Sequence, residues 1–177
     1  MKTTIRVSAP GNETSRSPSI SGDGRFVAFS SLADNLVEGD TNEKMDIFVF
    51  DRAQGKLDCL TRGGDGHSFN PVVSANGRFV AFVSQATNLV AGDLNGHEDV
   101  FMHDRRTGQT WRASIDSLGR EAEGRSGSPA LSADGRFLAF ESAAENLVPD
   151  DTNASRDIFV RDNCQPQQKS AFLCLRF

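Results

Sequence analysis

The chain has little of several things that common classes of protein depend on. Among its 177 residues are three Cys, one Trp and no Tyr, and Phe, with 13 copies, is nearly the only aromatic residue. Three scattered cysteines are too few for a disulfide framework or a closed zinc site. Lys and Arg number 19 against 24 Asp and Glu, and this net charge of −5 argues against a surface for nucleic acid or for an anionic membrane.

Long hydrophobic runs are also missing. No stretch of the sequence approaches the roughly 18–20 apolar residues that span a bilayer. The first residues, Met1–Arg6, lack the apolar core of a signal peptide, so none is expected here. A chain of this length has room for a substantial hydrophobic core, and we expect one structural unit over residues 1–177.

What the sequence does contain is a threefold internal repeat. One block occurs at Ser17–Phe29, Asn70–Phe82 and Ser128–Phe140, so its prolines at 18, 71 and 129 are 53 and 58 residues apart. Two further blocks follow at the same offsets, one at Asn35–Asn42, Asn88–Asn95 and Asn146–Asn153, the other at Asp46–Asp51, Asp99–Asp104 and Asp157–Asp162. The longer second offset comes from an insertion near residues 118–122. Three matched blocks indicate three copies of one structural unit.

Each unit is predicted to consist of β-strands. The dipeptides Asp23-Gly24, Asn76-Gly77 and Asp134-Gly135 favour tight hairpin turns, because glycine readily adopts a positive φ. Each turn leads into a strand such as Arg25–Ser31, whose apolar residues fall on both faces, so both faces of the sheet should be covered. A third strand (Asp46–Asp51) and a fourth follow, and no apolar stripe of helical period persists anywhere.

Four antiparallel strands per unit, covered on both faces, predict the blades of a β-propeller, an all-β fold. One blade cannot bury both of its faces alone. We expect blade 1 at 16–61, blade 2 at 69–114 and blade 3 at 127–162, followed by a divergent tail at 163–177 in which the normal fourth strand of blade 3 is missing. The alternative is a β-sandwich, which has no need of near-identical four-stranded units.

The repeated block Ser132–Phe140, followed by Asp157–Asp162, resembles the WD40-like PD40 repeat of TolB-type propellers. The resemblance covers about residues 3–162 and implies a β-propeller fold. It implies a bacterial protein of the periplasm or the extracellular space, although this sequence shows no signal peptide. For function it implies several roles, among them binding scaffolds and propeller domains attached to peptidases.

Three blades are too few for a ring, because propellers close with about four to eight. Residues Thr3–Ser8 align with the fourth strands Lys56–Thr61 and Gln109–Ser114, which makes them a fourth strand without its own blade. In one interpretation two chains form a homodimer, residues 3–8 of one complete blade 3 of the other, and a six-bladed ring results. In the other interpretation the chain is a piece of a longer propeller. An open three-bladed monomer would expose two apolar faces, so we favour the dimer.

The loop before each third strand is the main candidate site. Its oxygen ligands at positions 1, 3 and 7 suit a hard cation such as calcium. The nine residues are Asp40, Asn42 and Asp46, Asp93, Asn95 and Asp99, and Asp151, Asn153 and Asp157. In the alternative interpretation the first Asp and the Asn cap an Asx turn, and the last Asp ties the loop to the next strand.

Other residue types suggest structural roles. His67, His97 and His103 have no ligand-like spacing and are expected on the surface. The recurrent arginines, Arg25, Arg78 and Arg136, are expected to pair with the recurrent aspartates. Cys59 is expected to be a buried thiol, and Cys164 and Cys174 are candidates for a disulfide in an exported protein.

These features favour a non-catalytic propeller that binds a protein, a peptide or a carbohydrate and associates with itself. Two alternatives stay open, namely a calcium-stabilised structural module and a hydrolase or lyase whose site several blades assemble in the channel. No nucleophile elbow, zinc-protease motif or phosphate loop occurs in the sequence. We therefore expect no catalytic residue and no cofactor apart from calcium.

Overall fold

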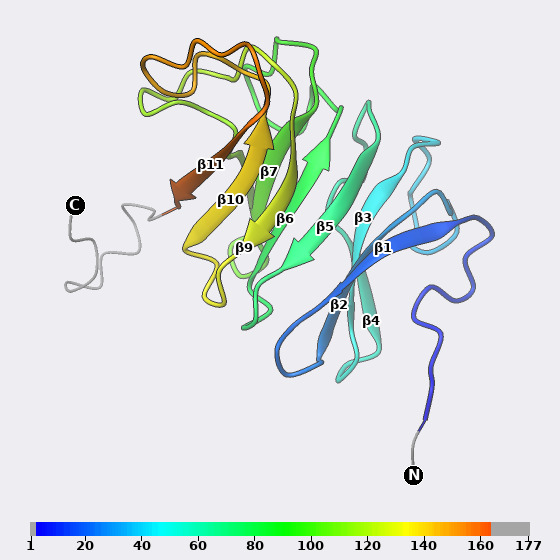
Figure 1. The fold of residues 1–177 in the computed structure, drawn as a ribbon. Coiled ribbons are helices and arrows are strands. Elements are labelled where there is room, and N and C mark those ends of the chain that lie inside the picture. The colour runs from blue at the N-terminus through cyan, green and yellow to red at the C-terminus, as the bar shows by residue number, and fades with distance from the viewer. Residues whose placement is uncertain (1–2, 164–177) are drawn as a thin grey trace.

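The computed structural model describes residues 3–163, which form eleven β-strands and no helix. Within this part of the chain there is accordingly no helix that could cross a membrane. The strands make three antiparallel sheets, which follow one another along the chain as separate blades (Figure 1). The predicted all-β class and its blade-like units are confirmed.

Each sheet is a meander in chain order. Blade 1 consists of β1 (Ser15–Ile20), β2 (Phe26–Ser31), β3 (Asp46–Asp51) and β4 (Lys56–Cys59). Blade 2 consists of β5 (Ser68–Val73), β6 (Phe79–Ser84), β7 (Asp99–Asp104) and β8 (Gln109–Arg112). In the described residues blade 3 has three strands, β9 (Ser126–Leu131), β10 (Phe137–Ser142) and β11 (Asp157–Asp162). The predicted tail at 163–177 lies outside the described residues apart from Asn163.

Glycines close the first hairpin of every blade, as predicted. Gly24, Gly77 and Gly135 have φ angles of 70°, 70° and 76°. The N–H group of each donates a hydrogen bond of 2.9 Å to the carbonyl oxygen of the serine three residues earlier. Positive φ is strained for a residue with a Cβ, which is why glycine stands at these three places.

A proline lies inside the first strand of each blade, where the strand contains a β-bulge. Proline has no N–H group for the ladder, so a bulge in the pairing accommodates it. The residue before it takes a positive φ of 53°, 52° or 49° at Ser17, Asn70 and Ser128. The repeat therefore encodes the same irregularity three times.

The recurrent arginines pair with the aspartates that end the third strands, which confirms that prediction. The closest distances are 2.7 Å for Arg25–Asp51, 2.6 Å for Arg78–Asp104 and 2.8 Å for Arg136–Asp162. Each pair joins the start of the second strand to the end of the third. Hydrogen bonds from Arg25 hold the pKa of Asp51 down at about 2.

The core lies between blades. One buried cluster joins a face of blade 1 to blade 2 and contains Ala28, Ile47, Val49, Val73, Val80, Phe82 and Phe101. The second joins the other face of blade 2 to blade 3 and contains Phe79, Ala81, Val100, Met102, Leu138 and Phe140, among others. Blade 2 is thus covered on both faces, whereas blades 1 and 3 are each packed on one side by another blade.

The fourth strand predicted at residues 3–8 is not formed within the single chain. Residues 3–6 have no regular structure, and residues 7–10 make a turn. A strand needs a neighbour to pair with, and within residues 3–163 no blade precedes blade 1. The insertion near 118–122 is accommodated by a small hairpin, in which Ile115 pairs with Glu121.

Candidate functional site

The three acidic loops occupy the same place in each blade, immediately before the third strand. Asp46 and Asp99 begin β3 and β7 and are completely buried, while Asp40 and Asp93 lie beside them and are nearly so. The loop of blade 3, with Asp151 and Asp157, is more exposed.

The asparagine of each loop closes an Asx turn. The side-chain oxygen of Asn42 accepts a hydrogen bond of 3.0 Å from the backbone N–H of Lys44. The equivalent bonds from His97 to Asn95 and from Ser155 to Asn153 are both 2.8 Å. This part of the loop therefore has the geometry of the structural interpretation, because the asparagine oxygen already has a backbone partner.

A hydroxyl group fixes the last aspartate of the loop in blades 1 and 2. Thr61 donates to Asp46 and Ser114 donates to Asp99, each at 2.5 Å. The same hydroxyls accept hydrogen bonds from the backbone at the start of the third strand, 2.9 Å from Ile47 and 3.0 Å from Val100. The residue two positions after the fourth strand thereby holds the acidic loop in place.

In blade 2 an arginine occupies the centre of the loop. One guanidinium nitrogen of Arg112 lies 3.1 Å from Asp93, 3.5 Å from Asp99 and 2.7 Å from Glu121. Burial, and then the charge of Asp99, raise the pKa of Asp93 to about 6. The guanidinium of Arg112 therefore occupies the place at which a metal cation would bind these carboxylates.

Blade 1 differs at one decisive position. The residue equivalent to Arg112 is Cys59, and the ligand atoms of Cys59, Asp40 and Asp46 lie within 4.8 Å of one another. The second carboxylate oxygen of Asp46 is buried and has no hydrogen-bond partner. Burial raises the pKa of Asp46 to about 6 and that of the Cys59 thiol to about 12, so the thiol is protonated at neutral pH.

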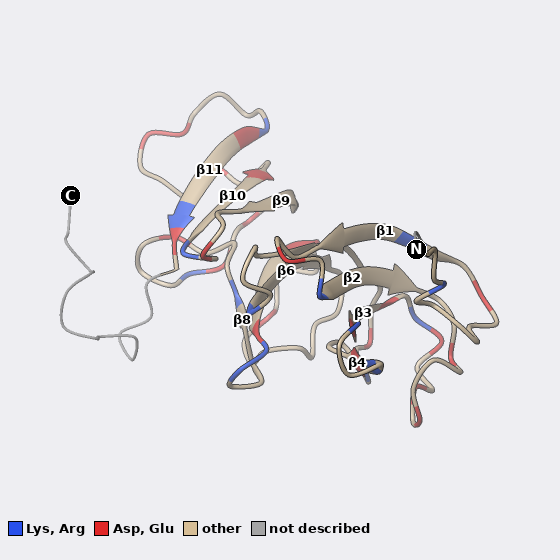
Figure 2. Ribbon diagram, turned by 90° about the horizontal axis from the view of Figure 1, so that it is seen from below, with Lys and Arg blue, Asp and Glu red and all other residues tan. Residues whose placement is uncertain are grey.

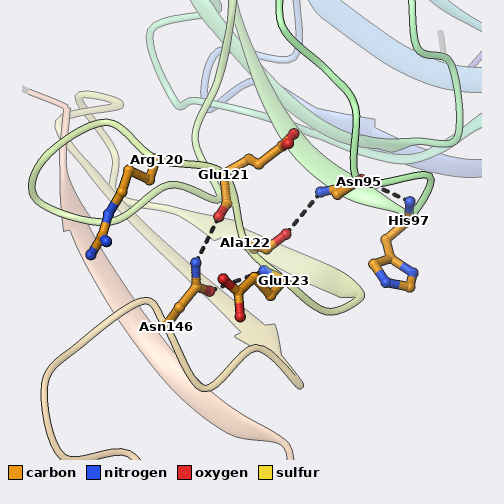
Figure 3. Close-up of a pocket in the computed structure, with 7 residues that line it drawn as sticks. All are labelled: Asn95, His97, Arg120, Glu121, Ala122, Glu123 and Asn146. Carbon is orange, nitrogen blue, oxygen red and sulfur yellow. Dashed lines mark hydrogen bonds between the residues drawn. The ribbon is translucent and has the colours of Figure 1, made fainter.

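A pocket of about 410 Å³ lies between the acidic loop of blade 2 and the segment that enters blade 3 (Figure 3). Asn95 donates a hydrogen bond of 2.9 Å to the carbonyl oxygen of Ala122, and Asn146 donates one of 2.9 Å to that of Glu121. Both asparagines thus hold the entering segment. The lining residues offer an exposed imidazole (His97) and carboxylates but no serine or cysteine nucleophile.

The histidines are only partly as expected. His67 and His97 are exposed, whereas His103 is buried in β7 and its Nδ1 atom lies 2.9 Å from the hydroxyl of Thr110. The expectation of a surface position is therefore wrong for His103, because both faces of blade 2 are covered. Burial lowers its pKa. Cys164 and Cys174 lie outside the described residues.

Sequence reasoning missed two sets of residues. One is Arg112, which an alignment of β8 with β4 could have found, because Arg112 and Cys59 occupy equivalent positions of the two strands. The second set consists of asparagines in the second repeat block, Asn35, Asn88 and Asn146, each of which accepts a hydrogen bond from the segment that enters its own blade. Their recurrence was visible, but their partners lie more than twenty residues away.

Comparisons with known proteins agree with the fold. No protein-family model and no curated protein matches the chain. Among solved structures, TolB from Acinetobacter baumannii is similar with a TM-score of 0.51 and 23% identity, over 86% of this chain and 30% of that one. Putative TolB from Agrobacterium tumefaciens is similar with a TM-score of 0.56 and 15% identity, over 89% of this chain and 48% of that one.

A third similar structure is the propeller domain of the Trilobed protease from Pyrococcus furiosus, described as having an open velcro topology. Its TM-score is 0.54 at 16% identity, over 86% of this chain and 40% of that one. The chain spans less than half of the length of each of these three proteins. At such identities the likeness concerns the fold, and on that ground the chain has the TolB-type β-propeller fold, in three blades.

Proposed function

We propose that the chain is a non-catalytic β-propeller module for binding and scaffolding, and that it closes its ring with a second copy. The observation that carries the proposal is the outer face of blade 3. It repeats most of the apolar pattern that blades 1 and 2 bury against the following blade, with Glu141 where blade 2 has Val83. Its side chains include Phe137, Ile158 and Val160, which are 42%, 73% and 70% exposed.

The glycine turns show how blades fit together. A Cβ atom on Gly77 would lie 2.1 Å from the ring of Phe26, and one on Gly135 would lie 2.4 Å from the ring of Phe79. Each phenylalanine thus packs on the glycine turn of the following blade. Gly24 has no aromatic ring within 4 Å, and in the described residues Phe137 has no following glycine turn to pack on. These two ends of the array are complementary.

In the contact between blades 1 and 2 an arginine also covers the phenylalanine ring, whereas the equivalent residue of blade 3 is Asn163. The guanidinium of Arg105 lies 4.0 Å from the ring centre of Phe26, and it donates a hydrogen bond of 2.7 Å to the carbonyl oxygen of Gly77. Arg52 donates the equivalent bond, 2.6 Å, to Gly24, without a ring from a preceding blade beneath it. Blade 3 of one copy therefore suits blade 1 of another, and two copies give six blades, within the range of about four to eight found in propellers.

Binding on the ring is favoured over catalysis by the chemistry of the described residues. The carboxylates of blade 2 are paired with Arg112, and the lining of the pocket between blades 2 and 3 contains no nucleophile paired with a base. The ring face and channel then offer a surface for a protein, a peptide or a carbohydrate. We expect the purified protein to show no activity in hydrolase and lyase screens. An activity that co-purifies with the protein would contradict this expectation.

Solution mass tests the association. Light scattering on a sizing column should give about twice the chain mass of 19.2 kDa. Ile158→Asp should give a folded monomer, because Ile158 is exposed in the single chain while the equivalent residue of blade 2, Val100, is buried among apolar side chains between blades, where a carboxylate would have no partner. Leu94→Asp, in an exposed loop, is the matched control and should remain dimeric. A wild-type monomer at all concentrations would overturn the association and favour a piece of a longer propeller.

A calcium-stabilised structural module is the second candidate, and one observation in blade 1 favours it. The unpartnered oxygen of Asp46 faces a group of possible ligands that has no arginine at its centre. Calcium should raise the melting temperature, magnesium should not, and Asp40→Asn should abolish the rise. No shift at millimolar calcium would exclude this role, and a shift with zinc alone that Cys59→Ser removes would point to a thiolate site instead.

A further inference from the structure

We propose that Arg6 and Ser8 of one copy complete the acidic loop in blade 3 of the other, as Arg112 and Ser114 complete that of blade 2. The exchanged segment, Thr3–Ser8, becomes the fourth strand of that blade. This inference rests on the proposed association of two copies and identifies the residues that the copies exchange.

The link after this segment already has the conformation that follows a fourth strand. The N–H group of Gly11 donates to the carbonyl oxygen of Ser8 at 2.9 Å, as Gly64 donates to Thr61 at 2.9 Å. The side-chain oxygen of Asn35 accepts a bond of 2.9 Å from the N–H group of Asn12. The bonds that Asn88 and Asn146 accept from the segments entering blades 2 and 3 are 3.1 and 3.0 Å.

The same asparagines also donate to these segments. Asn35 donates to the carbonyl oxygen of Pro10 at 3.3 Å. Asn88 and Asn146 donate to Gly63 and Glu121, both at 2.9 Å. The segment that enters blade 2 follows β4 of blade 1, and the segment that enters blade 3 follows β8 of blade 2. The end of the segment at Ser8 and the link that follows it therefore lie where the last strand of a preceding blade would end.

The alignment then fixes which side chain meets which. Ser8 is equivalent to Thr61 and Ser114, the hydroxyl residues that donate to Asp46 and Asp99. Two residues earlier, Arg6 is equivalent to Arg112, whose guanidinium lies between the carboxylates of blade 2. In blade 3 the equivalent carboxylates are Asp151 and Asp157, so Ser8 would donate to Asp157 and Arg6 would lie between both carboxylates as a shared cation.

β11 offers the edge on which this strand fits. β7 pairs with β8, whereas within the described residues β11 pairs only with β10. The pairs Phe101–Arg112 and Met102–Trp111 of blade 2 correspond to Phe159–Arg6 and Val160–Ile5. The exposed apolar side chains of Ile5 and Val160 would then cover each other.

The donor of the strand has to be another copy. Residues 3–8 lie beside blade 1, and β11 lies at the far end of the array of blades, as two perpendicular views show (Figures 1 and 2). Head-to-tail packing brings these two ends together, because blade 3 of one copy then lies against blade 1 of the next. In a closed pair the exchange occurs twice.

A disulfide between copies tests the pairing. One sample carries Ile5→Cys and another Val160→Cys, both in a background with Cys59, Cys164 and Cys174 replaced by Ser. Mixing and mild oxidation should give a covalent dimer whose disulfide joins positions 5 and 160. Arg161→Cys in place of Val160→Cys is the matched control and should not cross-link, because neighbouring side chains of a strand point to opposite faces.

The arginine has its own readout. Arg6→Ala should raise the dissociation constant of the dimer about 30-fold or more, because it leaves two carboxylates unpaired in the interface. Arg16→Ala, in β1 beside residues of blade 2, should change it less than about twofold, since exposed charges away from an interface contribute little. Circular dichroism on each variant confirms that the blades are folded.

The outcomes separate this inference from the association itself. A wild-type dimer that neither cross-links at positions 5 and 160 nor weakens on Arg6→Ala overturns the strand exchange and leaves the ring intact. A third blade completed by the tail of its own chain would give that result. A monomer at all concentrations overturns both.

Discussion

Blades 2 and 3 have almost the same sequence pattern but different surroundings. Every residue of β7 is buried, whereas the residues of β11 alternate between partly buried and exposed. The two strands agree closely in register with their neighbours and in the Arg–Asp pair at their ends. A repeat therefore determines local structure, while burial depends on which blades lie on either side.

The charge environment of the acidic loops in blades 1 and 2 likewise depends on residues outside the loops. Both loops have a buried aspartate held by a hydroxyl group just after the fourth strand, yet Arg112 fills the second loop and Cys59 faces the first. One substitution in the fourth strand thus decides whether a guanidinium lies directly between the carboxylates, as Arg112 does; in blade 1 the charge of Arg62 still acts on Asp40. Four predictions test these comparisons, in order of decreasing effect.

The largest difference is expected between equivalent phenylalanines. Phe79→Ala should lower the free energy of unfolding by about 3–5 kcal/mol, because the ring is buried between blades 2 and 3 and leaves a cavity. Phe137→Ala should cost less than about 1 kcal/mol in the dissociated chain, where the ring is partly exposed. Urea denaturation at low protein concentration measures both, and equal losses would contradict the comparison.

The arginine of blade 2 comes next. Arg112→Met should cost about 3 kcal/mol, because it leaves Asp93, Asp99 and Glu121 without their shared cation. Arg120→Met, whose exposed side chain pairs with Asp116, is the control and should have little effect. Thermal denaturation decides the matter: similar melting temperatures for the two variants would show that the buried cluster needs no guanidinium.

A smaller contrast is expected between two turn glycines. Gly24→Ala and Gly77→Ala both place a Cβ at positive φ, which costs about 1 kcal/mol. At Gly77 the new methyl group also meets the ring of Phe26, and overpacking adds about 1–3 kcal/mol. Chemical denaturation of the monomer should therefore rank Gly77→Ala as the less stable. In the dimer Gly24→Ala should additionally weaken association, and an unchanged dissociation constant would argue against Phe137 packing there.

The smallest effect concerns acid. Arg25 holds the pKa of Asp51 at about 2, below its unfolded value of about 3.8. The pair therefore stabilises the fold above pH ~4, and that stabilisation is lost as the pH falls toward 2. Arg25→Gln should flatten the melting temperature between pH 4 and 2. An unchanged dependence of the melting temperature on pH in this variant would contradict this account.

Much of the fold could be predicted because its signals are local. The glycine turns depend on neighbouring residues, and the pairs of Arg25, Arg78 and Arg136 with the third strands could be inferred because opposite charges recur in every copy of the repeat. The partners of the recurrent asparagines are backbone groups, which leave no such signal. The surface position expected for His103 failed because covering its face requires neighbouring blades. The calcium hypothesis for the nine loop residues stays a prediction, now sharpest at Asp40 and Asp46.

The sequence by itself determined the number of blades, the strands and their turns, because each depends on a hydrogen-bonding pattern that one repeat contains. Only the tertiary structure decided which carboxylates have a cation and which apolar faces are covered. Those properties depend on residues from adjacent strands and blades, such as Arg112 beside Asp93 and Phe26 on Gly77, and no single repeat encodes its neighbours.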